Sequence, residues 1–148
     1  MDFAFTSEQD MLRDTVARLV REQYDFDTRR KVAKSEAGWR PEMWSQFAEL
    51  GLLGASFSEA DGRFAGCPIE TMIISEEFGK GLVIEPYLQT VVIGGGFLRY
   101  GGTAAQKEEN LADLIGGERR YAFAYSEPKS RYDLNDVSTT AKKDGKGF

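Results

Sequence analysis

The chain contains 148 residues, of which 41% are hydrophobic and 29% charged, and its formal net charge is −5. This composition is typical of a folded globular domain, and the acidic balance argues against nucleic-acid binding, because phosphate contacts need clustered basic side chains. The absence of histidine and the presence of a single cysteine exclude an internal disulfide and histidine acid–base catalysis, and no metal site is predicted.

Two amphipathic helices are predicted in the first third of the chain. Thr6 and Gln9 form a capping-box pattern, which marks a helix start. Apolar residues then recur at three- and four-residue spacing and define a buried face: Met11, Leu12, Val16, Leu19 and Val20. Pro41 favours the start of another helix and Gly51 its end, and this helix has its own apolar face: Met43, Trp44, Phe47 and Leu50. The basic run at residues 29–31 is interpreted as a solvated helix face, and residues 52–68 as a long loop.

Further helical patterns cover residues 68–78 and residues 85–100, and Thr103 with Gln106 forms a second capping-box pattern. The helix that follows this second pattern is expected to end at residues 116–117, so that about five or six helices precede this point. Three consecutive glycines interrupt the helix of residues 85–100: Gly94, Gly95 and Gly96. Each glycine in a helix interior costs about 1 kcal/mol relative to alanine, so we expect the close approach of another helix or of a ligand at this point.

The sequence pattern changes from a period of about 3.6 residues to a period of two after Glu118. Aromatic and small residues alternate over residues 121–126, which predicts a strand, and residues 137–142 predict a second strand before the turn signal at residues 144–145. Two strands do not make an independently stable sheet, so we expect the returning strand to lie beyond Phe148. The prediction is a mainly α protein with a helical domain over residues 1–117 and the beginning of a β-domain over residues 118–148.

The polar turn that ends the strand of residues 121–126 has two interpretations. An exposed serine and backbone amides at a strand end can hydrogen-bond a flat heterocycle, while neighbouring aromatic side chains pack on its face. The alternative is an ordinary amphipathic strand whose aromatic side chains fill a core.

An ordered set of short motifs resembles those of the acyl-CoA dehydrogenase family. The motifs keep the family's order along nearly the whole chain: DFAFTSEQ (2–9), WSQFAELGLLG (44–54), SEADG (58–62), EEFG (76–79), GTAAQK (102–107), YSEP (125–128) and DG (144–145). Three further segments look closest to the family's small-subunit members, such as pimeloyl-CoA dehydrogenase small subunits: EPYL (85–88), SEPKSRYD (126–133) and DVSTTA (136–141). The resemblance implies the family's N-terminal helical domain followed by the first strands of its middle β-domain.

The resemblance further implies that FAD lies against this β-domain and contacts Phe123, Tyr125 and Ser126. Ser126 stands where a threonine or serine of the family bonds the pyrimidine side of the isoalloxazine ring. Residues 129–133 depart from the family's G-x-G-S-D pattern, which puts its contacts to CoA and to the flavin phosphates in doubt. Arg131 in this segment is open to two interpretations, a phosphate contact or an ion pair with a neighbouring aspartate.

For the acyl-CoA substrate, the resemblance implies a pocket bordered by the helix of residues 85–100. Gln89, Ile93 and Gly96 are expected to line this pocket, and Tyr132 is a further expected substrate contact. Glycines at this place would widen the pocket for a bulky or branched acyl group.

The family reaction removes the proton beside a thioester carbonyl and passes a hydride from the adjacent carbon to the flavin. Its carboxylate base comes from the C-terminal helical domain, so no catalytic residue is expected in this chain, and the chain alone is predicted to be inactive. Electron-transfer flavoprotein is the expected electron acceptor, within a homo- or hetero-oligomer. Two alternatives remain: a non-catalytic partner subunit of a heteromeric enzyme, and a flavin oxidase or monooxygenase on the same fold.

The start of the chain lacks the basic region and apolar run of a signal peptide, and no stretch approaches about 18 apolar residues. We therefore expect a cytoplasmic protein with no membrane span.

Overall fold

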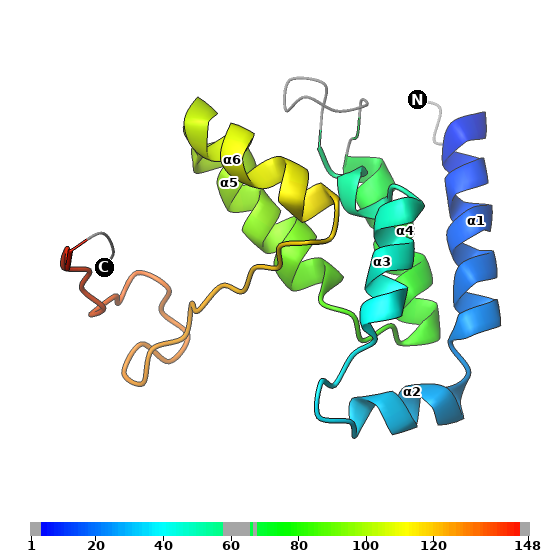
Figure 1. Cartoon of the computed structure of the whole chain (residues 1–148), viewed down its shortest axis with the longest axis horizontal. Helices are drawn as coiled ribbons and strands as arrows, with labels where there is room; N and C mark the ends of the chain where they lie inside the picture. The colour runs from blue at the N-terminus through cyan, green and yellow to red at the C-terminus, as the bar shows by residue number, and fades with distance from the viewer. Residues whose placement is uncertain (1–3, 58–65, 67, 146–148) are drawn as a thin grey trace.

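The computed structural model describes residues 4–57, 66 and 68–145 of the chain. Six α-helices, one 3₁₀ turn and one π-helix form in this part (Figure 1): α1 (Ser7–Gln23), α2 (Phe26–Ala33), α3 (Pro41–Glu49), η1 (Leu52–Gly54), α4 (Pro68–Gly81), η3 (Leu88–Gly94), α5 (Gly95–Gly101) and α6 (Ala104–Ile115). The predicted mainly helical fold is confirmed. The motif at residues 58–62 and residues 2 and 3 lie outside the described part.

Helix α1 begins at the predicted capping box and runs beside α4. Thr6 Oγ1 accepts a hydrogen bond from Gln9 N at 3.2 Å, and Gln9 Oε1 accepts one from Thr6 N at 3.1 Å. Gln9 Nε2 also donates to Glu70 Oε1 of α4 at 2.9 Å. Near the other end of the pair, a Cβ at Gly81 would lie 2.2 Å from Val20 Cγ1. The two helices therefore pack closely along their lengths (Figure 1).

The core lies between α1, α3, α4 and α6 and is rich in aromatic rings. Phe47 stacks on Phe78 with ring centroids 4.7 Å apart, and Phe78 meets Tyr87 edge-on at 5.2 Å. Trp44 is buried, and its Nε1 donates to Gly117 O at 2.9 Å, which holds the end of α6 against α3. Because burying one large apolar side chain contributes about 1.5–3 kcal/mol, this cluster stabilises the helical domain strongly.

Two apolar residues predicted to be buried are exposed instead, Met11 by 66% and Leu50 by 44%. Met11 lies only two positions after the buried Gln9, and residues two apart on a helix point in different directions. Leu50 is the C-cap of α3, where the chain leaves the helix and turns towards η1. The apolar pattern alone therefore misplaced both residues, since Met11 lies outside the buried face of α1 and Leu50 lies where α3 has already ended.

Helix α2 lies across the ends of α1 and α4 (Figure 1) and buries none of its own residues. Arg30 and Lys31 are exposed, in agreement with the predicted solvated face. Arg29 differs from them, because its Nε donates to Leu82 O at 2.7 Å, just after the end of α4. Part of the basic run therefore has a structural role in joining α2 to α4.

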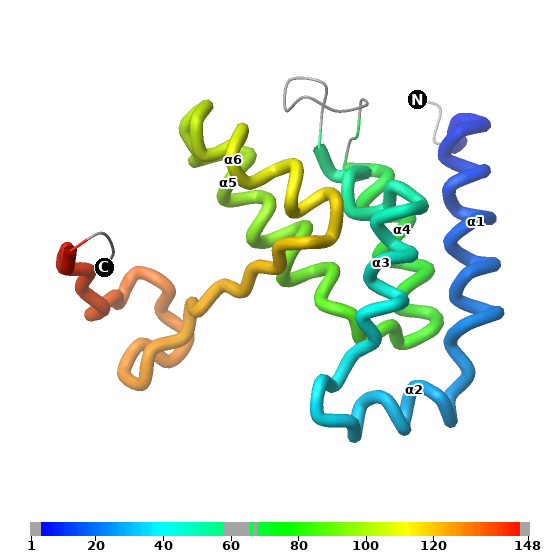
Figure 2. Tube along the Cα trace, viewed as in Figure 1, coloured from blue at the N-terminus to red at the C-terminus, as the bar shows by residue number. Residues whose placement is uncertain are grey.

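Residues 118–145 leave the helices as an extended chain interrupted by turns (Figure 2). The strands predicted at residues 121–126 and 137–142 do not form in this described segment. A strand needs neighbouring backbone groups as hydrogen-bond partners, and here the Glu127 carboxylate accepts the amides of Ser138 and Thr139 instead. The division into domains at residue 117 stays a prediction.

No helix within the described ranges has both the length and the apolar character that a membrane-spanning segment requires.

Candidate functional site

The three consecutive glycines around the junction of η3 and α5 have different surroundings. A Cβ at Gly94 would lie 2.4 Å from Tyr121 Cβ, and a Cβ at Gly95 would lie 2.6 Å from Phe57 Cζ. A Cβ at Gly96 would meet no atom of the described residues within 4 Å. Close packing therefore explains the first two glycines, whereas the third faces open space.

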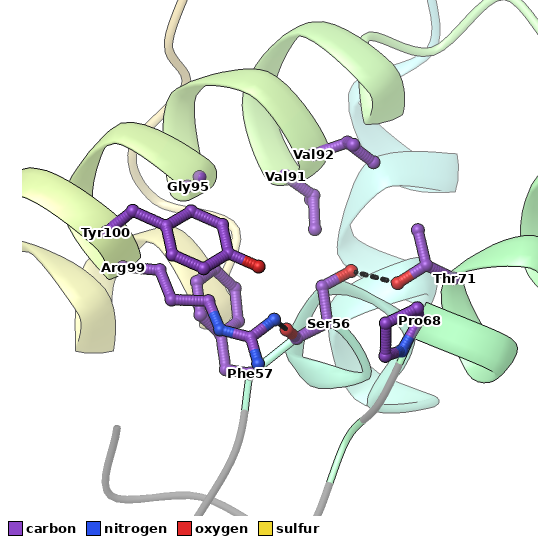
Figure 3. Close-up of a pocket in the computed structure, with 10 residues that line it drawn as sticks. Ser56, Phe57, Pro68, Thr71, Val91, Val92, Gly95, Arg99 and Tyr100 are labelled. Atoms are coloured by element: carbon purple, nitrogen blue, oxygen red, sulfur yellow. Dashed lines mark hydrogen bonds between the residues drawn. The ribbon is translucent and has the colours of Figure 1, made fainter. Parts of the chain in front are cut away.

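A small cavity of about 190 Å³ lies between the end of η1, α4 and α5 (Figure 3). Its walls are mainly apolar: Phe57, Val91, Val92, Gly95 and Gly96. The hydroxyl oxygens of Ser56 and Thr71 lie 2.9 Å apart, and Arg99 reaches across from α5 to donate from Nη1 to Ser56 O at 2.9 Å (Figure 3). Because these polar groups bond to one another, the cavity is suited to a small apolar group.

A wider and more open depression of about 530 Å³ follows α5. Ile93 and Gly96, both predicted to contact the substrate, lie together in it beside Phe97 and Tyr100. Gly96 also lines the small cavity, so the two spaces are neighbours across this glycine. The structure thus brings two of the predicted substrate residues into one apolar site.

The other two predicted substrate residues lie elsewhere. Gln89 lines a separate cavity of about 420 Å³ together with Leu82 and Glu85. Gln89 is exposed on η3, whereas Ile93 lines the depression that follows α5. Tyr132 is fully exposed on the turn after residue 127. The substrate roles of all these residues stay predictions.

The predicted flavin contacts lie beside the depression. The Phe123 ring packs on Phe97 of α5 at 4.7 Å, and the Tyr125 ring lies 5.8 Å from Phe123. Phe123 and Tyr125 are 48% and 61% exposed, and Ser126 next to them is exposed as well. We call the three rings of Phe97, Phe123 and Tyr125 the aromatic row. Exposed aromatic faces beside an exposed hydroxyl fit a flat heterocycle with polar edges, and they therefore fit the flavin ring of FAD.

Glu127 holds the turn that follows the aromatic row. Its carboxylate accepts hydrogen bonds from Ser138 N at 2.8 Å, from Thr139 N at 3.0 Å and from the Ser138 hydroxyl. These bonds, with the Ser138 side-chain contact the strongest, lower the pKa of Glu127 to about 2. The structure therefore gives Glu127 a role in ordering the loop, as expected for a loop carboxylate.

Sequence reasoning missed the buried carboxylate of Glu85, which lies at the start of the predicted helix of residues 85–100. Its Oε1 lies 3.3 Å from Arg40 N, which donates to it, and 3.7 Å from Arg40 Nε. Its Oε2 is buried with no hydrogen-bond partner in the described part of the chain, and desolvation raises the pKa of Glu85. Only a tertiary contact between residues far apart in sequence marks this residue, so no local pattern could have revealed it.

Within the described residues, no group of three or more aspartate, glutamate or cysteine side chains is placed to hold a metal ion.

The sequence model of the acyl-CoA dehydrogenase N-terminal domain matches residues 6–118. The chain belongs to the acyl-CoA dehydrogenase family. It is 31% identical to the probable acyl-CoA dehydrogenase YngJ of Bacillus subtilis, covering 98% of this chain and 38% of that protein. It is 29% identical to the acryloyl-CoA reductase (NADH) of Anaerotignum propionicum, covering 95% of this chain and 36% of the reductase. The chain thus spans less than two fifths of the length of these relatives.

Two solved structures share the fold of this acyl-CoA dehydrogenase family member. The Tcur3481-Tcur3483 steroid ACAD superimposes with a TM-score of 0.76 at 25% identity, over 98% of this chain and 38% of that one. The ChsE4-ChsE5 complex from Mycobacterium tuberculosis superimposes with a TM-score of 0.79 at 24% identity, over 98% and 37%. Both comparisons extend beyond the helices into the segment that carries the aromatic row.

Proposed function

We propose that this chain is part of an FAD-dependent acyl-CoA dehydrogenase that introduces an α,β double bond into an acyl-CoA thioester. The observation that carries the proposal is the position of Phe97, which lines the open depression and also packs on Phe123 at 4.7 Å. Hydride transfer requires the acyl group and the flavin ring to lie next to each other. Phe97 joins the predicted substrate side of the site to its predicted flavin side.

In this proposal each group of the chain binds or orients a reactant. When bound, FAD supplies the acceptor for the hydride. The aromatic row packs against the flavin ring, and the Ser126 hydroxyl hydrogen-bonds its polar edge. Ile93 and Gly96 give the acyl group an apolar wall that excludes water. No residue of this chain serves as the base, which we expect from a C-terminal helical domain.

A second candidate function is that of a non-catalytic partner subunit. The names of both structural neighbours give two components, Tcur3481 with Tcur3483 and ChsE4 with ChsE5. This favours a heteromeric enzyme in which one polypeptide completes the site of the other. Electron-transfer flavoprotein as acceptor and a cytoplasmic location belong to the proposal in either case.

The test compares the purified 148-residue chain with the same chain co-expressed with the products of its neighbouring genes. We expect the chain alone to retain little FAD, and a complete assembly to show acyl-CoA-dependent bleaching of the flavin absorbance without oxygen. Bleaching by the chain alone would contradict its predicted inactivity. An assembly that binds acyl-CoA but holds no flavin would contradict the proposed function.

The same assembly distinguishes a dehydrogenase from a flavin oxidase or monooxygenase on this fold. Reduced flavin should pass its electrons to electron-transfer flavoprotein much faster than to oxygen. Rapid reoxidation by oxygen, with formation of hydrogen peroxide, would favour the oxidase alternative.

A further inference from the structure

Thr90 lies in the π-helix η3 with its side chain fully buried, and it bonds to both backbone polar groups of Tyr121. Its Oγ1 donates to Tyr121 O at 3.2 Å and accepts from Tyr121 N at 3.2 Å. In an antiparallel sheet, a directly facing residue pairs with both of these groups. The Thr90 hydroxyl therefore takes the place of a neighbouring strand for this one residue.

Two more contacts fix Tyr121 against the helices. Its backbone lies so close to η3 that a Cβ at Gly94 would come within 2.4 Å of Tyr121 Cβ. Its phenol hydroxyl donates to Asn110 Oδ1 of α6 at 2.8 Å. Tyr121 is thus held through its backbone, its Cβ and its ring, on two different helices.

The position of Tyr121 determines which side of the following segment faces α5. In extended chain every second side chain points to the same side, so Phe123 and Tyr125 follow the direction set by Tyr121. The ring contacts of the aromatic row agree with this alternation. A slip of one residue would turn both rings to the opposite side.

We propose that Thr90 is a positioning residue for flavin binding, which sets the register of residues 121–126 on the helical domain. This inference rests on the proposed function and adds a residue that touches neither flavin nor substrate. The π-helical conformation of η3, which contains Thr90, supports this proposal, because π-helical segments frequently occur at functional sites.

The first arm of the test measures backbone amide exchange by NMR in the 148-residue chain. Thr90→Val keeps the shape of the side chain but removes both hydrogen bonds, whereas Thr90→Ser keeps the hydroxyl. We expect Thr90→Val to increase the exchange rate of the Tyr121 amide about tenfold, the factor that one net hydrogen bond corresponds to. Thr90→Ser should stay within about twofold of the parent chain.

The second arm measures FAD affinity in the flavin-containing assembly described above. Thr90→Val should raise the Kd for FAD about tenfold or more and shift the absorbance bands of bound flavin, while Thr90→Ser restores both. Thr103→Val is the matched control, because it removes a threonine hydroxyl that caps α6 without touching Tyr121. This control should leave the flavin spectrum unchanged.

Four results from the variants would overturn the inference. They are parent-like exchange of the Tyr121 amide in Thr90→Val, parent-like FAD affinity in that variant, a Thr90→Ser variant as impaired as Thr90→Val, or an equal loss of affinity in Thr103→Val. An assembly without any flavin would overturn both this inference and the proposed function. A flavin-binding assembly with a normal Tyr121 amide in Thr90→Val would overturn this inference alone.

Discussion

Glu127 and Glu85 show how their surroundings shift the pKa of a carboxylate in opposite directions. Glu127 is partly exposed and accepts hydrogen bonds from Ser138 and Thr139, which stabilise its charged form and lower its pKa. Glu85 is buried, and one of its oxygens has no hydrogen-bond partner among the described residues; the loss of hydration destabilises its charged form and raises its pKa. The first carboxylate orders a loop, whereas the second is held in the core beside Arg40.

The low pKa of Glu127 predicts how the loop responds to acid. Its pKa falls from the ordinary 4.5 to about 2 in the folded chain. Its contribution to stability is therefore complete above pH 4.5 and is lost as the pH falls towards about 2. We expect the NMR shifts of the Ser138 and Thr139 amides to titrate with a midpoint near the lower value.

Glu127→Gln serves as the control for this titration. The variant keeps an oxygen acceptor but cannot ionise, so both amide signals should lose their response in this pH window. A midpoint near the ordinary value in the parent chain would show that the hydrogen bonds do not hold the carboxylate in solution.

At the scale of the elements, capping boxes and apolar spacing within short segments predicted the helices. Features that depend on contacts between distant residues were not predicted. The capping boxes at Thr6 and Thr103 are contained in four neighbouring residues each, and both are present in the structure. The π-helix η3 has no such signal, because nothing in residues 88–94 alone favours it over an α-helix. The family resemblance placed Gln89 with Ile93 by their order along the helix, although the two residues line different cavities.

The candidate site was predictable only in part, because its glycines and aromatic residues contact partners that are distant in sequence. The glycine run predicted the close approach of another helix or of a ligand, whereas the residues packed against Gly94 and Gly95 are Tyr121 and Phe57, which lie outside the helices and are distant in sequence. The alternation over residues 121–126 indicated one aromatic side, and the packing of Phe123 on Phe97 agrees with it. A strand did not follow from this alternation, because pairing depends on backbone partners that a local pattern does not contain.

Replacing either of two glycines near the end of α4 by alanine is predicted to change stability in opposite directions, because Gly81 lies against α1. Gly79→Ala should raise the free energy of unfolding by up to about 1 kcal/mol, because alanine favours the helix and its Cβ meets no atom of the described residues within 4 Å. Gly81→Ala should lower it by about 1–3 kcal/mol, because the new Cβ would lie 2.2 Å from Val20 Cγ1. Urea denaturation of the two variants beside the parent chain measures both values.

The two variants act as controls for each other, since both make the same chemical change within one helix. Equal stabilisation by both substitutions would show that α1 does not press on α4 at Gly81 in solution. Equal destabilisation would show that residue 79 is not in a regular helical conformation.

At the scale of the whole molecule, the segment after α6 differs from the helices in how it is held. Helices α1, α3, α4 and α6 share one buried core, whereas the segment after α6 is held to the helices by residues near its start. Gly117 accepts from Trp44, Arg119 pairs with Asp113, Arg120 lies over the Trp39 ring, Tyr121 bonds Thr90, and Phe123 packs on Phe97. Beyond Ser126 almost every described side chain is exposed, and Ser130 is the buried exception. Exposed aromatic side chains that gather beside an apolar depression are typical of a binding surface.

This difference predicts the order in which trypsin cleaves the chain. A protease needs a segment that opens locally, and segments with few buried contacts open most readily. Among the basic residues that the structure describes, Lys129, Arg131, Lys142 and Lys143 lie after the aromatic row, and they should therefore be cleaved before the basic residues in α1 and α6. Mass spectrometry of a time course should find early products that end at these residues and keep both Thr90 and Tyr121. Early cleavage at Arg18 of α1 or at Lys107 of α6 would instead show that the helical core opens as readily as the segment it carries.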